Sequence, residues 1–373
     1  MGKNTQADQV ISYIYIHVPF CLKKCSYCSF FSVEISKDAI NRFVKYLIKE
    51  INLFKLKYQI KPKTIYFGGG TPSLLTARQI NSIISQFDVS GTEEITLECN
   101  PVNINKKFAE ALISTPVNRI SLGAQSFLDS ELKILGRLHK ADEIGDVYKL
   151  LRDCGYNNIS LDLIYGLPNQ TIEDVEFSLD EIMQLDPEHV STYCLSLDKH
   201  VLLFSRVDQI PTDEKVAEFY YLIRNKLISS GFSHYEISNY TKSGFESKHN
   251  LCYWNDDHYL GFGPSAAGYI ENIRYNNTAN FEEYYKMLDE NKIMIDKLIL
   301  NEDDHEKEYI FLGLRKATGI NLEEFENIFK INFTEKYDSI INKFKKMLKI
   351  NDKTIKLKPE AYFISNEIFV EFM

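Results

Sequence analysis

The strongest constraint on the fold is an alternation of short β-rich runs with helical patterns over the first two thirds of the chain. Between the first two runs, apolar residues recur at helical spacing from Ile40 to Phe54. Strands that alternate with helices form parallel sheets with right-handed crossovers, either an open doubly wound sheet or a partial (β/α) barrel. We therefore expect an α/β fold whose site lies at the carboxyl ends of the strands. The six expected strands are residues 13–18, 64–68, 94–99, 119–122, 157–163 and 189–197.

Helix signals and a change of composition divide the chain further. Thr76 with Gln79 forms a capping box, and Thr171 opens another helix. After about residue 244 the chain becomes rich in glycine, asparagine and aromatics, without a long periodic helix. From residue 302 we expect helices at 303–316 and 322–348 and strand-like pieces at 354–357 and 362–364, the outline of a small helical or winged domain. The expected domains are therefore 1–244, 245–300 and 301–373.

Composition bounds the class of protein. The chain has 373 residues and a formal net charge of −9, which argues against general affinity for nucleic acid. Residues 1–9 are polar, without the apolar run of a signal peptide, and no stretch approaches 18 uninterrupted apolar residues. Four of the seven cysteines are scattered singly, as buried reduced thiols would be. We expect a protein of the reducing cytoplasm.

Three cysteines close together form the principal chemical motif. Cys21, Cys25 and Cys28 follow the first expected strand with the spacing C-x3-C-x2-C. A structural zinc site wants four ligands, and an electron-transfer [4Fe–4S] cluster usually takes four cysteines. Three thiolates leave one iron open, as required for reduction of S-adenosylmethionine (SAM) to a radical. A disulfide with a spare thiol is disfavoured in a reducing compartment, and a zinc site completed by His17 or His139 is the alternative.

Polar and glycine residues follow the other expected strands. Gly68, Gly69 and Gly70 lack a Cβ, so a ligand can approach the backbone, although a tight turn explains them too. Glu98, Gln125 and Asp162 would be unsatisfied in a core and fit ligand contacts better, with helix capping as the alternative. A ligand site beside the cysteine loop is the better explanation of these features together.

The motifs together resemble the radical-SAM family of oxygen-independent coproporphyrinogen III oxidases, and within it the heme chaperone branch. The likeness runs from Tyr13 to Phe369 and implies a partial (β/α)6 barrel with a [4Fe–4S] cluster, SAM and heme as cofactors. It rests on Tyr15-x-His17-x-Pro19-Phe20-Cys21-x3-Cys25-x2-Cys28, Gly68-Gly69-Gly70-Thr71-Pro72-Ser73, Ser121-Leu-Gly123-x-Gln125-Ser126-Phe127 and Asp162-Leu-Ile-Tyr-Gly166-Leu167-Pro168. The SAM contacts that it implies are Tyr15, the backbone near Tyr27, Gly69, Gly70, Thr71, Glu98, Gln125, Arg137 and Asp162.

Two features favour the chaperone branch over the oxidase. The oxidase has a further cysteine where this chain has Phe30, and a longer extension before the cluster than the 20 residues here. His249, Tyr253 and Trp254 match the heme-binding pattern of the chaperone branch; an imidazole can bind heme iron and flat aromatics can pack against the macrocycle. From the residues alone, a buried histidine in an aromatic cluster explains them as well. Cys252 is an alternative iron ligand that we rank below His249.

Three classes of function are compatible with these features. The first is a heme chaperone that uses a SAM-ligated cluster and delivers heme to an acceptor, for which a respiratory hemoprotein or a membrane-associated protein is a candidate. The second is a SAM-radical enzyme acting on a tetrapyrrole, the coproporphyrinogen oxidase included. The third, a nucleic-acid-modifying enzyme, is disfavoured by the acidic net charge, and the C-terminal lysines fit a solvated face. Monomer and homodimer are both compatible with the sequence. Gly261-Phe-Gly263 imitates a dinucleotide fingerprint, but we expect no strand before it.

Overall fold

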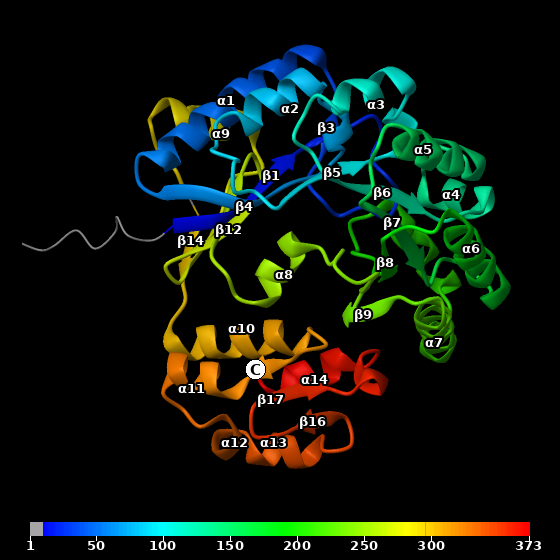
Figure 1. Cartoon of the computed structure of the whole chain (residues 1–373), viewed down its shortest axis with the longest axis vertical. Coiled ribbons are helices and arrows are strands. Elements are labelled where there is room, and N and C mark those ends of the chain that lie inside the picture. The colour runs from blue at the N-terminus through cyan, green and yellow to red at the C-terminus, as the bar shows by residue number, and fades with distance from the viewer. Residues whose placement is uncertain (1–9, 295) are drawn as a thin grey trace, which may run out of the picture.

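One large sheet organises the computed structural model, which describes residues 10–294 and 296–373. Residues 1–9, on which the expectation about a signal peptide rests, lie outside the described residues. Twelve strands of the described chain pair in the order β14-β13-β12-β11-β1-β4-β5-β6-β7-β8-β10-β9. The sheet curves strongly, and its concave side faces the middle of the molecule (Figure 1). No helix within the described ranges is long and apolar enough to cross a membrane.

Six neighbouring parallel strands make the centre of this sheet and confirm the predicted alternation. A seventh strand that the sequence did not predict, β11 (Tyr259–Phe262), lies parallel to β1 on its other side. The fold is therefore α/β, with an open sheet rolled into part of a barrel. The six predicted strands are β1 (Val10–Val18), β4 (Gln59–Gly69), β5 (Glu94–Cys99), β6 (Arg119–Gln125), β7 (Ile159–Tyr165) and β8 (His189–Cys194).

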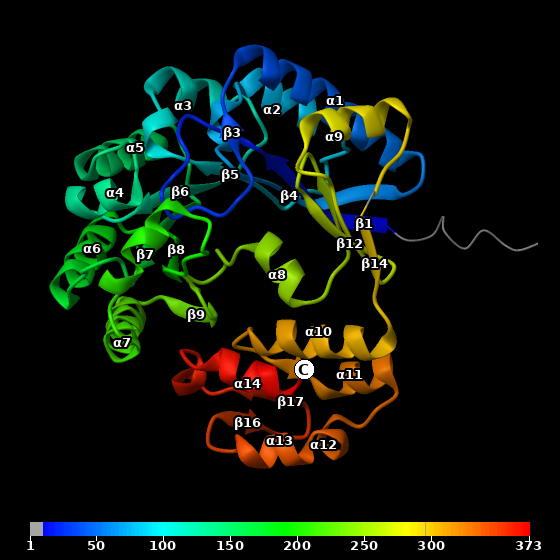
Figure 2. The same ribbon diagram turned by 180° about the vertical axis from the view of Figure 1, so that it is seen from behind.

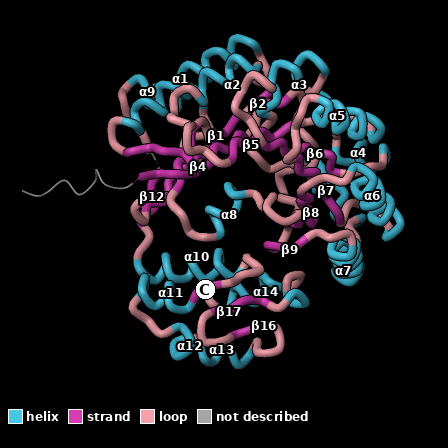
Figure 3. The backbone as a smooth tube through the Cα atoms, viewed as in Figure 1, coloured by secondary structure: helices cyan, strands magenta, loops and turns pink. Residues whose placement is uncertain are grey.

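Helices cover the convex face of the sheet, because the strands alternate between apolar and polar side chains. On β6, Ile120 and Leu122 are buried in the apolar core, whereas Ser121 between them lines a cavity. The predicted capping box forms at Thr76, and the helix predicted to open at Thr171 does so with a capping box of its own. Figure 3 shows the helices as an outer layer around the strands: α1 (Lys37–Lys55), α2 (Ala77–Ile84), α3 (Lys106–Leu112), α4 (Asp129–Leu135), α5 (Ala141–Asp153), α6 (Ile172–Leu185) and α7 (Asp213–Ser229).

Antiparallel strands extend both edges of the parallel centre. At one edge, β10 (Asn239–Thr241) and β9 (Ser233–Glu236) follow β8. At the other, β12 (Ala267–Ile270), β13 (Ile273–Asn276) and β14 (Asp296–Ile299) follow β11. The expectation of no strand before Gly261 is wrong, since Gly261 lies within β11; β12 follows it in place of the helix that a dinucleotide fingerprint needs.

Between these edges, α8 (Lys248–Trp254) lies inside the concave side of the sheet, and α9 (Phe281–Asp289) lies beside α1 on the outside (Figures 1 and 2). The short helix α8 contains the segment predicted to bind heme and contacts Thr64 on β4 and Glu94 on β5. The division of the chain at residues 244 and 300 stays a prediction.

The C-terminal residues fold below the open side of the sheet (Figure 2). Helix α10 (Glu302–Leu314) confirms the first helix predicted there, and β17 (Thr354–Leu357) confirms a strand. The helix predicted at 322–348 is wrong: Lys330 ends α11 with a φ of 58°, and Asn332 caps a new helix. The strand predicted at 362–364 is also wrong: Tyr362 is helical, with a φ of −62° and a ψ of −38°, where it ends the 3-10 turn that Pro359 starts. The remaining elements are α11 (Leu322–Phe329), α12 (Phe333–Lys336), α13 (Asp338–Lys343), β15 (Ile320–Asn321), β16 (Leu348–Ile350) and α14 (Ser365–Glu371).

Candidate functional site

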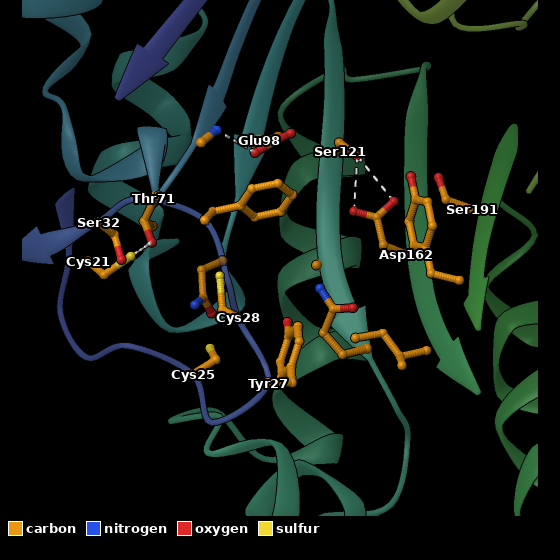
Figure 4. A pocket seen from close by; sticks show the side chains of 18 of the residues that line it. Cys21, Cys25, Tyr27, Cys28, Ser32, Thr71, Glu98, Ser121, Asp162 and Ser191 are labelled. Atoms are coloured by element: carbon orange, nitrogen blue, oxygen red, sulfur yellow. Dashed lines mark hydrogen bonds between the residues drawn. The ribbon is translucent and has the colours of Figure 1, made fainter. Parts of the chain in front are cut away.

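A cavity of about 460 Å³ opens at the carboxyl ends of the parallel strands, beside the three-cysteine loop. Figure 4 shows the cysteines on one side of this cavity, with Glu98 and Asp162 on the strands opposite. Buried polar atoms without a partner belong to several lining residues: Ser32 Oγ, Asn100 Oδ1, Arg119 Nε and Arg137 Nε. Because orphaned polar groups in a cavity are costly, the cavity suits a polar ligand.

The cysteine loop is fixed to the rest of the barrel through Ser26. The Ser26 amide donates to the Leu135 carbonyl at 3.0 Å, and its hydroxyl donates to the Ile134 carbonyl at 2.7 Å. The carbonyl of Ser26 accepts from the Leu203 amide at 2.8 Å. Thus the end of α4 and the segment at Leu203 hold the loop between Cys25 and Cys28 in place over the strand ends.

Cys21, Cys25 and Cys28 are free thiols that line the cavity together. The Thr71 hydroxyl donates to Cys21 Sγ at 3.5 Å, and Arg137 Nη1 donates to Cys25 Sγ at 3.6 Å. A hydroxyl and a guanidinium at these positions can donate hydrogen bonds to the sulfur atoms that ligate a cluster. The donor set therefore fits an iron–sulfur cluster.

The structure does not favour the zinc alternative. His17 contacts the Tyr15 hydroxyl through Nδ1 at 3.0 Å and the Phe31 carbonyl through Nε2 at 3.2 Å. His139 Nε2 contacts the Ala124 carbonyl at 3.2 Å. Among the described residues, no three or more histidine, cysteine, aspartate or glutamate side chains are grouped to hold a metal ion. The three thiols line one cavity of about 460 Å³, which has room for a polynuclear group.

Eight of the nine residues expected to contact SAM line this cavity: Tyr27, Gly69, Gly70, Thr71, Glu98, Gln125, Arg137 and Asp162. The ninth, Tyr15, is not among the lining residues. Its ring stacks on Tyr66, which does line the cavity, with centroids 6.2 Å apart. Tyr15 therefore supports the cavity wall from behind.

Two carboxylates give the cavity its acidic side. Glu98 accepts from the Tyr66 hydroxyl at 2.8 Å and from the Gly69 amide at 3.2 Å. Asp162 accepts from the Ser121 hydroxyl at 3.2 Å. Burial raises the pKa of Glu98 to about 7, and burial also raises the pKa of Asp162. Arg137 donates to the Gly123 carbonyl at 2.7 Å, so both signs of charge face the same space.

The glycines at the end of β4 are needed for packing as well as for ligand access. A Cβ on Gly69, whose φ is +107°, would lie 2.6 Å from the His17 ring. A Cβ on Gly70 would lie 2.7 Å from the Phe20 carbonyl oxygen. The backbone of β4 therefore approaches the start of the cysteine loop closely, which only glycine permits.

Gly69→Ala should destabilise the protein by about 2–4 kcal/mol, because both the left-handed φ and the clash with His17 oppose a side chain. Gly145→Ala on α5 is the matched control: nothing lies within 4 Å of its Cβ, so we expect no loss of stability or a small gain. Urea unfolding followed by circular dichroism compares the two. Equal stability of the two variants would contradict the packing role of Gly69.

The three residues expected to contact heme lie on α8 and are not among the residues that line this cavity. His249 is 1% exposed. Its Nδ1 contacts the Thr64 hydroxyl at 2.6 Å and its Nε2 contacts the Tyr253 hydroxyl at 2.8 Å. Burial lowers the pKa of His249 to about 3, so the imidazole is neutral. Both ring nitrogens are thus engaged while α8 is docked.

Trp254 points away from His249 toward the C-terminal residues. The Arg315 guanidinium lies 4.3 Å from the centroid of its ring. Trp254 also lines a separate cavity of about 270 Å³ with residues of the C-terminal region, Lys316 and Tyr309 among them. The structure therefore brings His249 and Tyr253 together but places Trp254 at the junction with α10.

Several lining residues were not expected from the sequence. Arg119 and Ser121 on β6 and Ser191 and Tyr193 on β8 all face the cavity, as does Tyr66 on β4. The sequence does contain a signal for such residues, since polar residues alternate with apolar ones along β5, β6 and β7. Strands that are buried on both faces are apolar throughout, so this alternation indicates that one face of the sheet lines a polar space. Phe30, in place of a cysteine, lies at the cavity and is 65% exposed.

Comparisons with known proteins agree with this geometry. Residues 15–182 match the Radical SAM superfamily. A curated heme chaperone HemW of Lactococcus lactis is 36% identical over 369 residues, covering 96% of both chains. A heme chaperone HemW of Bacillus subtilis is 32% identical and covers 96% of this chain and 98% of its own. The solved coproporphyrinogen III oxidase HemN of Escherichia coli superposes with a TM-score of 0.84 over 97% of this chain and 90% of its own, at 20% identity.

Proposed function

This chain belongs to the HemW family of heme chaperones and contains a Radical SAM superfamily domain, and from that premise we propose that it binds heme and transfers it to an acceptor protein. The observation on which the proposal rests is the full-length match to heme chaperones. The three-cysteine cavity supports it, because it offers a place for a SAM-ligated [4Fe–4S] cluster. We also propose the reducing cytoplasm as its compartment, because all seven cysteines are free thiols.

Within the cavity we assign Cys21, Cys25 and Cys28 as the cluster ligands. When bound, the cluster and SAM together supply reductive radical chemistry. The chain's own residues stabilise and orient these groups: Thr71 and Arg137 donate to the sulfurs. The remaining polar side chains would bind SAM, with Glu98 and Asp162 as acceptors and Gln125 and Arg137 as donors.

For heme we assign His249 as the axial ligand, with Tyr253 and Trp254 beside the ring. A neutral imidazole is the form that binds iron. In the docked position of α8, however, Thr64 and Tyr253 occupy both nitrogens of His249. Before His249 can ligate iron, its hydrogen bond with Tyr253 or its hydrogen bond with Thr64 must therefore break.

The alternative function is oxygen-independent coproporphyrinogen III oxidation or another SAM-radical reaction on a tetrapyrrole. The structural likeness to HemN supports a shared fold, since the sequence identity is only 20%. Phe30, where the oxidase has a further cysteine, favours the chaperone. A chaperone must bind heme and release it, whereas an oxidase must convert coproporphyrinogen III. Assays of both activities on one preparation therefore distinguish the two functions.

The deciding experiment starts from protein reconstituted anaerobically with iron and sulfide. Heme titration followed by absorption spectra should show saturable binding, and heme should move to an apo-hemoprotein acceptor. The same preparation, given SAM, a reductant and coproporphyrinogen III, should form no protoporphyrinogen. Ordinary turnover to protoporphyrinogen would establish the oxidase instead.

SAM binding should weaken below about pH 7. A buried Glu98 with a pKa of about 7 is protonated below that value and must lose its proton to accept hydrogen bonds from SAM. We therefore expect the dissociation constant to be flat above pH 7.5 and to rise toward tenfold per pH unit below pH 6.5. Calorimetry from pH 6 to 8.5 measures it, and Glu98→Gln should flatten the dependence. Identical pH profiles in wild type and Glu98→Gln would refute the assignment.

A further inference from the structure

Helix α8 also forms part of the wall of the SAM cavity. Asn250, the second residue of the pattern that begins at His249, is one of the residues that line the cavity. His249, Tyr253 and Trp254 are not among them. Within the described part of the chain, the side-chain amide of Asn250 has no hydrogen-bond partner; its contact with Ser247 Oγ at 3.3 Å is made by the backbone N–H.

The docked position of α8, and with it that of Asn250, is set by a buried carboxylate. Glu94, on the strand that also bears Glu98, accepts from the Lys248 amide at 3.0 Å and from the His249 amide at 3.1 Å. A carboxylate at the start of a helix satisfies N–H groups that have no partner within the helix. Lys248 adds an ion pair with Glu93 at 2.5 Å. Asn250 is thus held at the cavity by contacts that do not involve its own side chain.

The chemistry of Asn250 fits a nucleoside ligand. Its amide both donates and accepts hydrogen bonds, as ribose hydroxyls and purine nitrogens require. Other residues that line the cavity carry hydroxyl, carboxylate and guanidinium groups, Tyr66, Glu98 and Arg119 among them. An unpaired amide at such a place completes the polar wall.

The same helix holds His249 in a position that excludes iron. The imidazole stacks on Tyr66 with ring centroids 5.1 Å apart and contacts Thr64. Strand β4 therefore covers it. A heme macrocycle needs open space on one side of the coordinating nitrogen. Therefore His249 can reach heme iron only when α8 leaves β4, and the adjacent Asn250 leaves the cavity wall with it.

We propose that Asn250 is a ligand-contacting residue of the SAM cavity, and that α8 either completes this cavity or presents His249 to heme iron, but not both. Heme and SAM therefore oppose one another in binding. This inference rests on the proposed heme and SAM functions of the chain. Its first half concerns SAM alone and stands without heme.

The first test measures SAM affinity by calorimetry on the reconstituted, heme-free protein. Asn250→Ala should weaken SAM binding about threefold to tenfold, the effect of one lost hydrogen bond. Asn255→Ala is the matched control: it ends the same helix and contacts Lys316, away from the cavity. Thermal melts and iron content verify that both variants fold and hold the cluster. Equal SAM affinity in Asn250→Ala and wild type would overturn the assignment.

The second test measures the SAM dissociation constant with and without saturating ferric protoporphyrin IX. In wild type, heme should weaken SAM binding at least fivefold, and SAM should weaken heme binding by the same factor. In His249→Ala, heme cannot draw α8 away, so SAM affinity should not respond to heme. If heme leaves the SAM dissociation constant of wild type unchanged, or changes it equally in both proteins, the proposal that α8 moves between the SAM cavity and heme is wrong. Absence of heme binding altogether would instead refute the proposed function and leave the Asn250 result intact.

Discussion

Cys25→Ser should abolish the [4Fe–4S] cluster, with iron and sulfide after anaerobic reconstitution falling close to zero. Three thiolates are the whole protein ligand set of such a site, so losing one leaves too few to hold the cluster. A serine hydroxyl is a poor substitute because it is not ionised at neutral pH. Arg137, which contacts Cys25 Sγ at 3.6 Å, would then face the cavity without its sulfur partner.

The control for this prediction is Cys154→Ser, at the end of α5 and away from the cavity lining. It should retain the wild-type content of iron and sulfide and the brown colour of the cluster. Cys21→Ser and Cys28→Ser should behave like Cys25→Ser. A full cluster in Cys25→Ser, or an equal loss in Cys154→Ser, would contradict the ligand assignment.

The central strands were predictable because each is a short apolar run between clear helix signals. All six lie where the periodicity placed them, and β5 has the predicted bounds. The strands β11 to β14 were missed for a physical reason. They are four residues each, too short for a clear local pattern. Their stability comes from pairing with β1 and with each other.

The error in the C-terminal region came from reading helical periodicity across a break. Apolar residues from Leu322 onward keep helical spacing, but Lys330 adopts the left-handed conformation and Asn332 accepts from the Glu335 amide at 3.0 Å. Asparagine followed three residues later by glutamate is a helix-start signal, and it was available in the sequence. The left-handed Lys330 and the Asn332 cap therefore divide the segment into separate helices, although the apolar spacing continues across them.

The site was predicted in part from strand ends and in part from resemblance. The strand ends identified Glu98, Gln125 and Asp162, which line the cavity. Resemblance added Tyr15, whose actual place behind Tyr66 depends on how β1 and β4 pair. No sequence pattern could show that α8 folds into the barrel, because its contacts with Thr64 and Glu94 join residues more than 150 positions apart.

In the heme site proposed above, these contacts of α8 are what heme must displace to reach His249. His249 Nε2 contacts the Tyr253 hydroxyl at 2.8 Å, and the Tyr253 ring meets the imidazole edge-on with centroids 5.1 Å apart. With His249 as the proposed heme ligand, Tyr253 has two opposed effects on heme binding. Its hydroxyl occupies a nitrogen that iron needs, whereas its ring offers apolar surface to the macrocycle.

Tyr253→Phe should consequently raise heme affinity about threefold to tenfold, since it frees Nε2 of one hydrogen bond and keeps the ring. Tyr253→Ala should lower the fraction of protein that binds heme, because about 1–3 kcal/mol of packing energy between the Tyr253 ring and the macrocycle is lost. His249→Ala should change the form of the heme spectrum, because the iron–imidazole bond is lost outright. Absorption titrations of the three variants at one pH separate these effects. If Tyr253→Phe binds heme more weakly than wild type, the hydroxyl assists heme and does not compete with it; if His249→Ala keeps the wild-type spectrum, another residue is the axial ligand.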